Sequence, residues 1–332
     1  MADESFVAEH GQAVSDAARR IHGKVVQTPC LSPAEMPGVV VKPECLQATG
    51  SFKVRGAFNA VLHLLEQPPR PPGVVTVSSG NHGQALAAVA RELGLPAVVV
   101  MTATAAPAKR EAVTRLGARV VSDNVTIETR EARFKEVVAE TGYTPVHPYD
   151  DWDVIHGQGT VGLELADQVP DAGVVAVPLG GGGLVSGTAI ALAYRGSGAR
   201  VVGVEPAEAD DARRSMAAGH LVSRSPGPTI ADGAAVTQIG ERPAEVLLGH
   251  RFVEEVVTVT DDELLATLPR IWRQTRLLAE PTGALALTAV LLGRVPAADG
   301  PTVAVISGGN IEHDLLISAL QAEGRAGAMA GA

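Results

Sequence analysis

Short apolar runs alternate with helical patterns along most of this 332-residue chain, and this alternation limits the fold more than any other feature. Short apolar strands separated by helices are typical of a parallel α/β sheet that is buried on both faces. The sequence therefore predicts an α/β fold. The predicted strands cover 74–77, 97–101, 119–122, 174–177, 201–204 and 303–306, and the first five lead into predicted helices 84–94, 107–117, 126–141, 184–195 and 207–219.

A proline-rich stretch marks the first expected crossing between two domains. Residues 67–73 read Gln-Pro-Pro-Arg-Pro-Pro-Gly, a composition typical of boundaries, and the chain is expected to cross back near 147–150. The Ala- and Gly-rich end is expected to be a disordered tail. The predicted parts are a large domain of 1–68 and 149–325, a small domain of 73–148 inserted in it, and the tail 326–332.

Charge and composition exclude several classes of partner. A formal net charge of −10 argues against nucleic acid and anionic membranes, and no apolar run is long enough to cross a bilayer. Residues 1–10 lack the apolar centre of a signal peptide, and Cys30 and Cys45 are too few for a disulfide framework. We therefore expect a cytoplasmic protein that acts on a small molecule.

Lys53 is the first candidate for chemistry. It lies in Thr-Gly-Ser-Phe-Lys-Val-Arg-Gly-Ala-Phe-Asn, residues 49–59, where a Gly- and Ser-bounded turn opens a predicted helix. Withdrawal from water disfavours the ammonium form, so the free amine that attacks carbonyl groups becomes available near neutral pH. Most lysines at helix starts are simply solvated, so the assignment depends on other segments.

Three glycine-containing turns support it. Ser-Ser-Gly-Asn-His-Gly at 78–83, four glycines at 180–183 and Ser-Gly-Gly-Asn at 307–310 each follow a predicted strand. Such turns bring ligand-binding groups to the carboxyl edge of a parallel sheet. The four glycines suit a phosphate, because they have no Cβ atoms and a helix begins directly after them.

A dinucleotide site is a different reading of the four glycines. Glu205 follows the next predicted strand, where an acid that binds ribose would be expected. However, the third glycine of G-x-G-x-x-G would fall on Val185 or Ser186. This reading also leaves Lys53 unexplained, so we favour the phosphate of another cofactor.

On these motifs, the chain resembles the serine/threonine dehydratase and serine racemase family of pyridoxal phosphate enzymes, of fold type II. The likeness extends from about 28 to 317. The resemblance implies two parallel-sheet α/β domains with pyridoxal phosphate in the cleft between them, and a homodimer. It includes four further motifs in the family's order, at 156–160, 205–211, 229–233 and 280–283.

The resemblance implies roles for individual residues. Lys53 would hold the cofactor's aldehyde through a C=N bond and then act as the base at the substrate Cα. Ser79 matches the racemase hydroxyl on the opposite face of the substrate, Asn81 would donate to the ring oxygen, and Ser307 would be a neutral partner of the pyridine nitrogen. Further implied cofactor residues are Phe52, Gly180, Gly181, Gly182 and Gly183. Further implied substrate residues are Ser78, Gly80, His82 and Arg130, together with Ser79 and Asn81.

A divalent-cation site is also implied. Glu205, Ala209 and Asp211 match the family's ligands, and two carboxylates with one backbone carbonyl suit Mg²⁺, Ca²⁺ or Mn²⁺. Acidic residues also favour the first turn of a helix, so a purely structural reading remains.

The predicted activity is a lyase reaction that converts L-threonine, L-serine or both to a 2-oxo acid and ammonium by β-elimination of water. Arg130 could bind a second carboxylate, or it could be one charge on a solvated helix face. The alternatives on the same scaffold are therefore a 3-hydroxyaspartate dehydratase and a serine/aspartate-type racemase. A non-enzymatic binding module is disfavoured, because Lys53 and the four glycines are intact.

Overall fold

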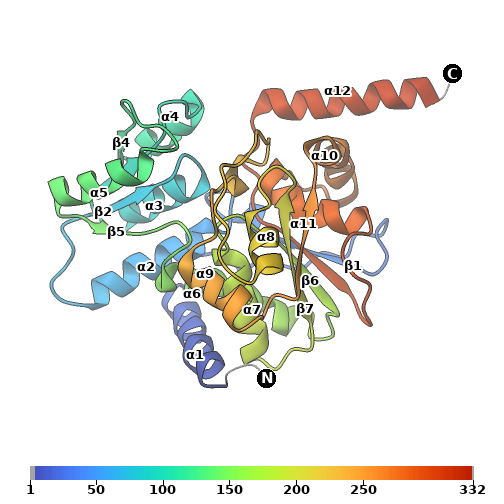
Figure 1. The fold of residues 1–332 in the computed structure, drawn as a ribbon, viewed down its shortest axis with the longest axis horizontal. Helices are drawn as coiled ribbons and strands as arrows, with labels where there is room; N and C mark the ends of the chain where they lie inside the picture. The colour runs from blue at the N-terminus through green and yellow to red at the C-terminus, as the bar shows by residue number, and fades with distance from the viewer. Residues whose placement is uncertain (1–3, 331–332) are drawn as a thin grey trace.

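The computed structural model describes residues 4–330, with the side chains of residues 4–321. In this part of the chain the strands form two separate sheets, and every pair of neighbouring strands is parallel (Figure 1). The predicted fold class, two parallel-sheet α/β units, is confirmed. The larger sheet has the order β1 (Val39–Pro43), β9 (Thr302–Ile306), β6 (Val174–Pro178), β7 (Arg200–Pro206) and β8 (Glu255–Val259). The smaller has the order β4 (Arg119–Val121), β3 (Ala97–Val100), β2 (Val74–Val77) and β5 (Thr144–Pro145).

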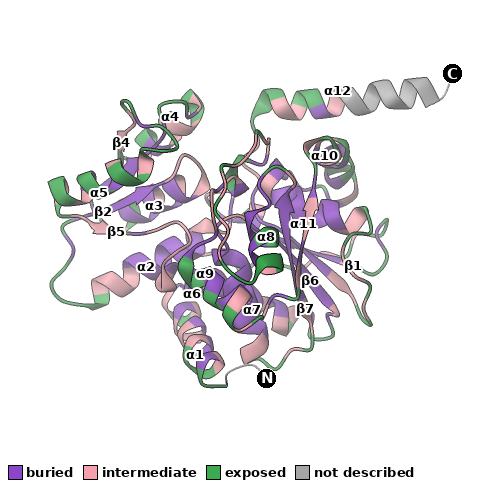
Figure 2. Ribbon diagram, viewed as in Figure 1, coloured by how far each residue is buried: buried purple, intermediate pink, exposed green. Residues whose placement is uncertain are grey.

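Helices cover both faces of the larger sheet because its strands are apolar on both sides. Val175 and Val177 of β6 pack into a core with α6 (Trp152–Gln168) and α7 (Gly183–Tyr194). Ala176, between them in sequence, packs on the opposite face against α10 (Asp261–Thr275) and α11 (Pro281–Leu291). Successive strand residues point to opposite faces, so an unbroken run of apolar residues requires two covering layers. Figure 2 shows β6, α7 and α11 as mostly buried, whereas much of α10 is intermediate or exposed.

The smaller sheet shares its core with a helix that precedes it in sequence. Val54, Ala57 and Val61 of α2 (Lys53–Glu66) pack with Val74 and Val99 of the small sheet. The helix that begins at Lys53 therefore lies against the smaller sheet, whereas the loop before it joins the larger one through a bridge between Ser51 and Gly308.

The remaining helices connect or flank the two sheets. They are α1 (Glu4–Arg20), η1 (Glu44–Leu46), α3 (Asn81–Glu92), α4 (Pro107–Arg115), α5 (Arg130–Thr141), α8 (Asp211–Ala218), η2 (Asp232–Ala234), α9 (Glu241–Ala244), η3 (Glu245–Gly249) and α12 (His313–Ala330). Among residues 4–330, no helix is both long and apolar enough to cross a membrane.

Some helix starts differ from the predicted ones for local reasons. Helix α3 begins at Asn81, three residues before the predicted start, so the Ser-Ser-Gly-Asn-His motif itself enters the helix. Helix α5 begins at Arg130 instead of 126, because the side chains of Thr126 and Thr129 bond to each other's backbone N–H groups in a turn. Such local side-chain bonds compete with the helix.

The domain boundaries remain predictions. The strands of the smaller sheet lie between 74 and 145, inside the predicted small domain of 73–148. The predicted disordered tail, 326–332, falls where side chains are not described, and its last two residues lie outside the described part of the chain.

Candidate active site

One cavity is lined by segments that follow the carboxyl ends of β2, β6 and β9. It brings together every residue predicted to bind cofactor or substrate. These are Phe52, Lys53, Ser78, Ser79, Gly80, Asn81, His82, Arg130, Gly180, Gly181, Gly182, Gly183 and Ser307. The predicted cation ligands Glu205, Ala209 and Asp211 do not line it.

Lys53 is the first residue of α2, and its amine is held inside the cavity wall. Its Nζ donates to the backbone carbonyl of Pro148 over 2.7 Å and lies 5.0 Å from the centre of the Phe52 ring. Burial lowers the pKa of Lys53 to about 8. Near neutral pH far more of this amine is therefore uncharged than for an ordinary lysine, as nucleophilic attack on an aldehyde requires.

The four glycines form a seat that side chains would block. A Cβ on Gly181 would lie 2.1 Å from the Tyr149 ring, and one on Gly180 would lie 2.8 Å from the Cα of Ala234. Gly182 has a φ of +93°, a left-handed conformation that favours glycine. Helix α7 begins at Gly183, so its N-terminal N–H groups and its positive end face the seat. The residues present therefore fit the phosphate of pyridoxal phosphate.

Ser307 and Asn81 are held by backbone and side-chain contacts around the same cavity. Ser307 directly follows β9 and is 2% exposed, and its carbonyl accepts from the N–H of Phe52 over 3.1 Å. The Nδ2 of Asn81 donates to Glu280 over 2.5 Å. A neutral hydroxyl and an amide at the cavity wall suit a ring nitrogen and a ring oxygen, respectively.

The loop after β2 combines small polar groups with a neutral histidine. The Ser79 Oγ accepts from the N–H of Thr102 over 3.1 Å and lies 3.3 Å from the Thr102 hydroxyl. His82 is buried, and burial with the nearby Lys53 charge lowers its pKa to about 3. His82 is therefore a neutral packing residue near Val146, whose carbonyl lies 3.3 Å from its Nε2, and it is no source of protons at neutral pH.

Arg130 reaches the cavity from the first turn of α5. Burial lowers the pKa of His147 to about 4, and the positive charges of Lys53 and Arg130 add to this effect. Lys53, Arg130 and Tyr149 all line the cavity. A negatively charged group of a ligand would be stabilised there.

The predicted cation ligands lie together at the end of β7, away from the cavity. Glu205 accepts from the N–H groups of Ala212 and Arg213, whereas the Asp211 carboxylate lies beside the N–H groups of Asp211 and Ile239 without a hydrogen bond of good geometry. Burial, with the charge of Asp211 adding to it, raises the pKa of Glu205 to about 8, and burial raises that of Asp211 to about 7. Within residues 4–321, no cluster of three or more His, Cys, Asp or Glu side chains suits a metal.

Several cavity residues were not assigned a role from the sequence. Glu280 and Thr282 belong to a motif that carried the resemblance, but no spacing rule indicated that they would face Lys53. Tyr149 lies at the predicted crossing between domains, and Asp232 lies in η2. For Glu280, the sequence signal was the Glu-Pro pair, which is typical of a helix start, and α11 does begin at Pro281.

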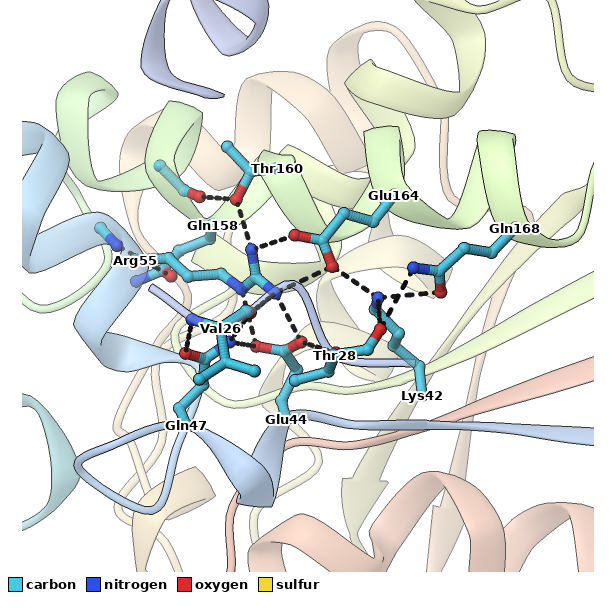
Figure 3. A network of polar contacts seen from close by, with 12 residues as sticks. Val26, Thr28, Lys42, Glu44, Gln47, Arg55, Gln158, Thr160, Glu164 and Gln168 are labelled. Atoms are coloured by element: carbon cyan, nitrogen blue, oxygen red, sulfur yellow. Dashed lines mark hydrogen bonds and ion pairs between the residues drawn. The ribbon is translucent and has the colours of Figure 1, made fainter. Parts of the chain in front are cut away.

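A buried polar network surrounds Arg55, which lies two residues after Lys53 on α2 (Figure 3). Arg55 forms ion pairs with Glu44 of η1, at 2.7 Å, and with Glu164 of α6, at 2.6 Å. Lys42 of β1 pairs with the second oxygen of Glu164 over 2.5 Å. Two cations thus balance two anions, and the network ties the start of α2 to three other elements.

Comparisons with known proteins agree with this geometry. A family model described as "Pyridoxal-phosphate dependent enzyme" matches residues 21–308. A β-hydroxyaspartate dehydratase of Paracoccus denitrificans is 39% identical over 278 residues, 83% of this chain and 86% of the relative. A serine racemase of Oryza sativa subsp. indica is 34% identical over 326 residues, 94% and 95% of the two chains.

A solved structure leads to the same conclusion. The crystal structure of a threonine deaminase from T.th. is 40% identical, covers 91% of this chain and 98% of its own, and has a TM-score of 0.83. The buried amine, the glycine seat and these similarities together show that the chain belongs to the pyridoxal-phosphate dependent enzymes of fold type II, the family of the threonine dehydratases and serine racemases.

Proposed function

We propose that this enzyme is an ammonia-lyase that removes water and then ammonia from a β-hydroxy amino acid, with L-threonine, L-serine or both as substrates. The observation that carries the proposal is the partly buried Lys53 amine in the same cavity as the glycine seat and Ser307. Bound pyridoxal phosphate supplies an aldehyde for a C=N bond and a ring that accepts electrons from the substrate Cα.

Lys53 serves as the base in this proposal. If a substrate amine took its place on the cofactor, Lys53 would be a free amine in the cavity, and burial lowers the pKa of this amine to about 8 in the chain as it stands. It can then remove the Cα proton of the substrate. The carbonyl of Pro148, 2.7 Å from Nζ, can hold the resulting ammonium group.

The nature of Ser307 supports elimination as the main reaction. A neutral hydroxyl such as that of Ser307 would leave the ring nitrogen unprotonated, so the ring would accept electrons from the substrate Cα more weakly, which favours prompt loss of a β-leaving group. Racemisation needs a second proton donor on the opposite face; the Ser79 Oγ accepts from the N–H of Thr102 and keeps its own hydrogen for donation. Ser79 also lines the cavity, so racemisation of the substrate is proposed as a side activity.

An assay of the purified enzyme with both enantiomers of serine, threonine and 3-hydroxyaspartate tests the proposed reaction. We expect 2-oxo acid and ammonium in equal amounts from the L-enantiomers of serine or threonine, and slower formation of the opposite enantiomer. Racemisation faster than ammonium release with every substrate would contradict the proposal.

A second candidate substrate is 3-hydroxyaspartate, which carries an additional carboxylate. Arg130 lines the cavity, and a guanidinium can bind a carboxylate through two hydrogen bonds. The relative from Paracoccus denitrificans is named for a β-hydroxyaspartate substrate, which supports this candidate.

Substitution of Arg130 by alanine distinguishes the two candidates. If Arg130 binds the second carboxylate, Arg130→Ala lowers kcat/KM for 3-hydroxyaspartate relative to serine by roughly tenfold or more, the loss expected for a charged hydrogen-bonded pair. Arg133→Ala is the matched control, because Arg133 lies on the same helix but pairs with Glu136 and Glu140. An unchanged ratio in Arg130→Ala would show that Arg130 does not recognise this carboxylate.

We also propose that Glu205, Asp211 and the Ala209 carbonyl bind Mg²⁺, Ca²⁺ or Mn²⁺. Two buried carboxylates side by side, both met by backbone N–H groups, leave negative charge that a cation would balance. Oxygen donors of this kind suit these hard cations.

Removal of the cation is expected to destabilise the protein. Protein treated with EDTA should melt several degrees lower than protein supplied with Ca²⁺ or Mg²⁺, since binding to the folded state alone stabilises it. Asp211→Asn should remove this response. Asp210→Asn should keep it, because Asp210 already pairs with Arg213, Arg214 and Arg224. Equal melting temperatures with EDTA and with excess cation would exclude the site.

The expected homodimer and cytoplasmic location remain proposals. The net charge of −10 suits a soluble enzyme with a small-molecule substrate, and sedimentation of the purified protein would test the dimer.

A further inference from the structure

The backbone carbonyl of Thr49 determines the orientation of the Asn310 side-chain amide near the cavity. Asn310 lies three residues after Ser307, and its Nδ2 donates to the carbonyl of Thr49 over 2.9 Å. A carbonyl can only accept, so the nitrogen of Asn310, and not its oxygen, must lie on this side. The second hydrogen of the same Nδ2 is donated to the Oδ1 of Asn81 over 2.8 Å.

The orientation of Asn310 in turn determines that of Asn81. Because Asn310 offers a donor, Asn81 must present its oxygen to it, and the Asn81 nitrogen then lies on the other side. That nitrogen donates one hydrogen to the carboxyl of Glu280 over 2.5 Å. Its second hydrogen remains for a ligand, and Asn81 lines the cavity.

Close packing leaves this arrangement little freedom. A Cβ on Gly308 would lie 2.1 Å from Glu280 Oε1 and 3.2 Å from Asn81 Nδ2, and one on Gly50 would lie 2.3 Å from Asn310 Oδ1. Glu280 is 8% exposed. The contacts also join the two sheets. Asn81 begins α3, which follows β2 of the smaller sheet, whereas Glu280 precedes α11 and Asn310 follows β9 of the larger sheet.

We propose that Asn310 and Glu280 are positioning residues that hold the amide of Asn81 so that it meets the cofactor's ring oxygen as a hydrogen-bond donor. A reversed amide would present an acceptor to an oxygen that is itself rich in electrons. Asn310 does not line the cavity, so it acts through Asn81, whereas Glu280 both contacts Asn81 and lines the cavity.

The isosteric substitution Asn310→Asp tests the proposal. An ionised aspartate cannot donate, so Asn81 would turn its nitrogen toward the introduced carboxylate and its oxygen toward Glu280 and the cavity. We expect the apoprotein to bind pyridoxal phosphate roughly tenfold more weakly, as measured by fluorescence titration. Affinity for 3-deoxypyridoxal phosphate, which lacks the ring oxygen, should change less than threefold. Equal losses for both compounds would overturn the proposal.

A double-mutant cycle separates this role from general destabilisation. If Asn310 acts through Asn81, the affinity of Asn81→Ala/Asn310→Asp equals that of Asn81→Ala alone, whereas independent effects would multiply. Asn310→Ala provides a second test without a new charge, and it should give a smaller loss of the same selectivity. Asn124→Asp, at an exposed site, is the matched control. Multiplicative losses in the cycle would overturn the proposal.

Substitutions of Glu280 test its contact with the amide of Asn81. Glu280→Ala removes the acceptor and should weaken cofactor binding severalfold. Glu280→Gln can keep a carbonyl oxygen toward Asn81 and should recover most of the affinity. The same affinity in both variants would show that Glu280 does not position Asn81.

Discussion

Replacement of Lys53 by alanine is expected to abolish turnover. The buried amine is both the group that holds the cofactor and the base that removes the substrate proton, so its loss should lower kcat/KM by roughly 10⁴-fold or more. The purified variant should also lack the visible absorbance band of a lysine-bound cofactor. The measurement is 2-oxo acid formation from L-serine and L-threonine, recorded together with the absorbance spectrum.

Two controls make this result specific to the amine. Lys135→Ala, at an exposed position on α5, should keep both the band and the activity. In the parent apoprotein, the rate of cofactor capture should rise with pH and level off above about 8, because burial lowers the pKa of Lys53 to that value. An ordinary lysine would continue to gain reactivity up to a pH near its usual pKa of about 10.4. Turnover in Lys53→Ala within tenfold of the parent would refute the assignment.

The strands could be predicted from the sequence because their signal is local. Runs such as 74–77 and 303–306 are continuous and apolar, and the structure places strands at these positions. Helix starts were less accurate where side chains bond to nearby backbone, as at Thr126 and Thr129. Pairing between Ser51 and Gly308 has no local signal at all, since the two residues are far apart in the sequence.

The candidate site was predictable only where a motif carries chemistry by itself. The motifs around Lys53, Asn81 and the four glycines indicated their place, and these residues do line one cavity. Glu280 was part of such a motif, but its contact with Asn81 joins residues 199 positions apart. Asn310 was visible in Ser-Gly-Gly-Asn, yet its importance arises from a hydrogen bond to a backbone carbonyl, which no sequence pattern reports.

The buried network around Arg55 leads to the second large expected effect. Arg55 and Glu44 are fully buried, and burial alone would raise the pKa of Glu44, but the Arg55 charge keeps this pKa below its ordinary value. Removal of one partner from a buried pair leaves an uncompensated charge, which costs about 3–5 kcal/mol. Arg55→Met leaves both Glu44 and Glu164 without this partner, so we expect a loss of at least that size.

Chemical denaturation of the parent and Arg55→Met proteins would measure this loss. Arg195→Met is the matched control, because Arg195 pairs with Asp167 at the surface, where such pairs contribute about 0–1 kcal/mol. The double variant Arg55→Met/Glu44→Gln should regain part of the stability, since it no longer buries the Glu44 charge unpaired. Lys42 still neutralises part of the Glu164 charge, so the regained stability depends mainly on removal of the Glu44 charge. If Arg55→Met were no less stable than Arg195→Met, the network would not anchor the helix that carries Lys53.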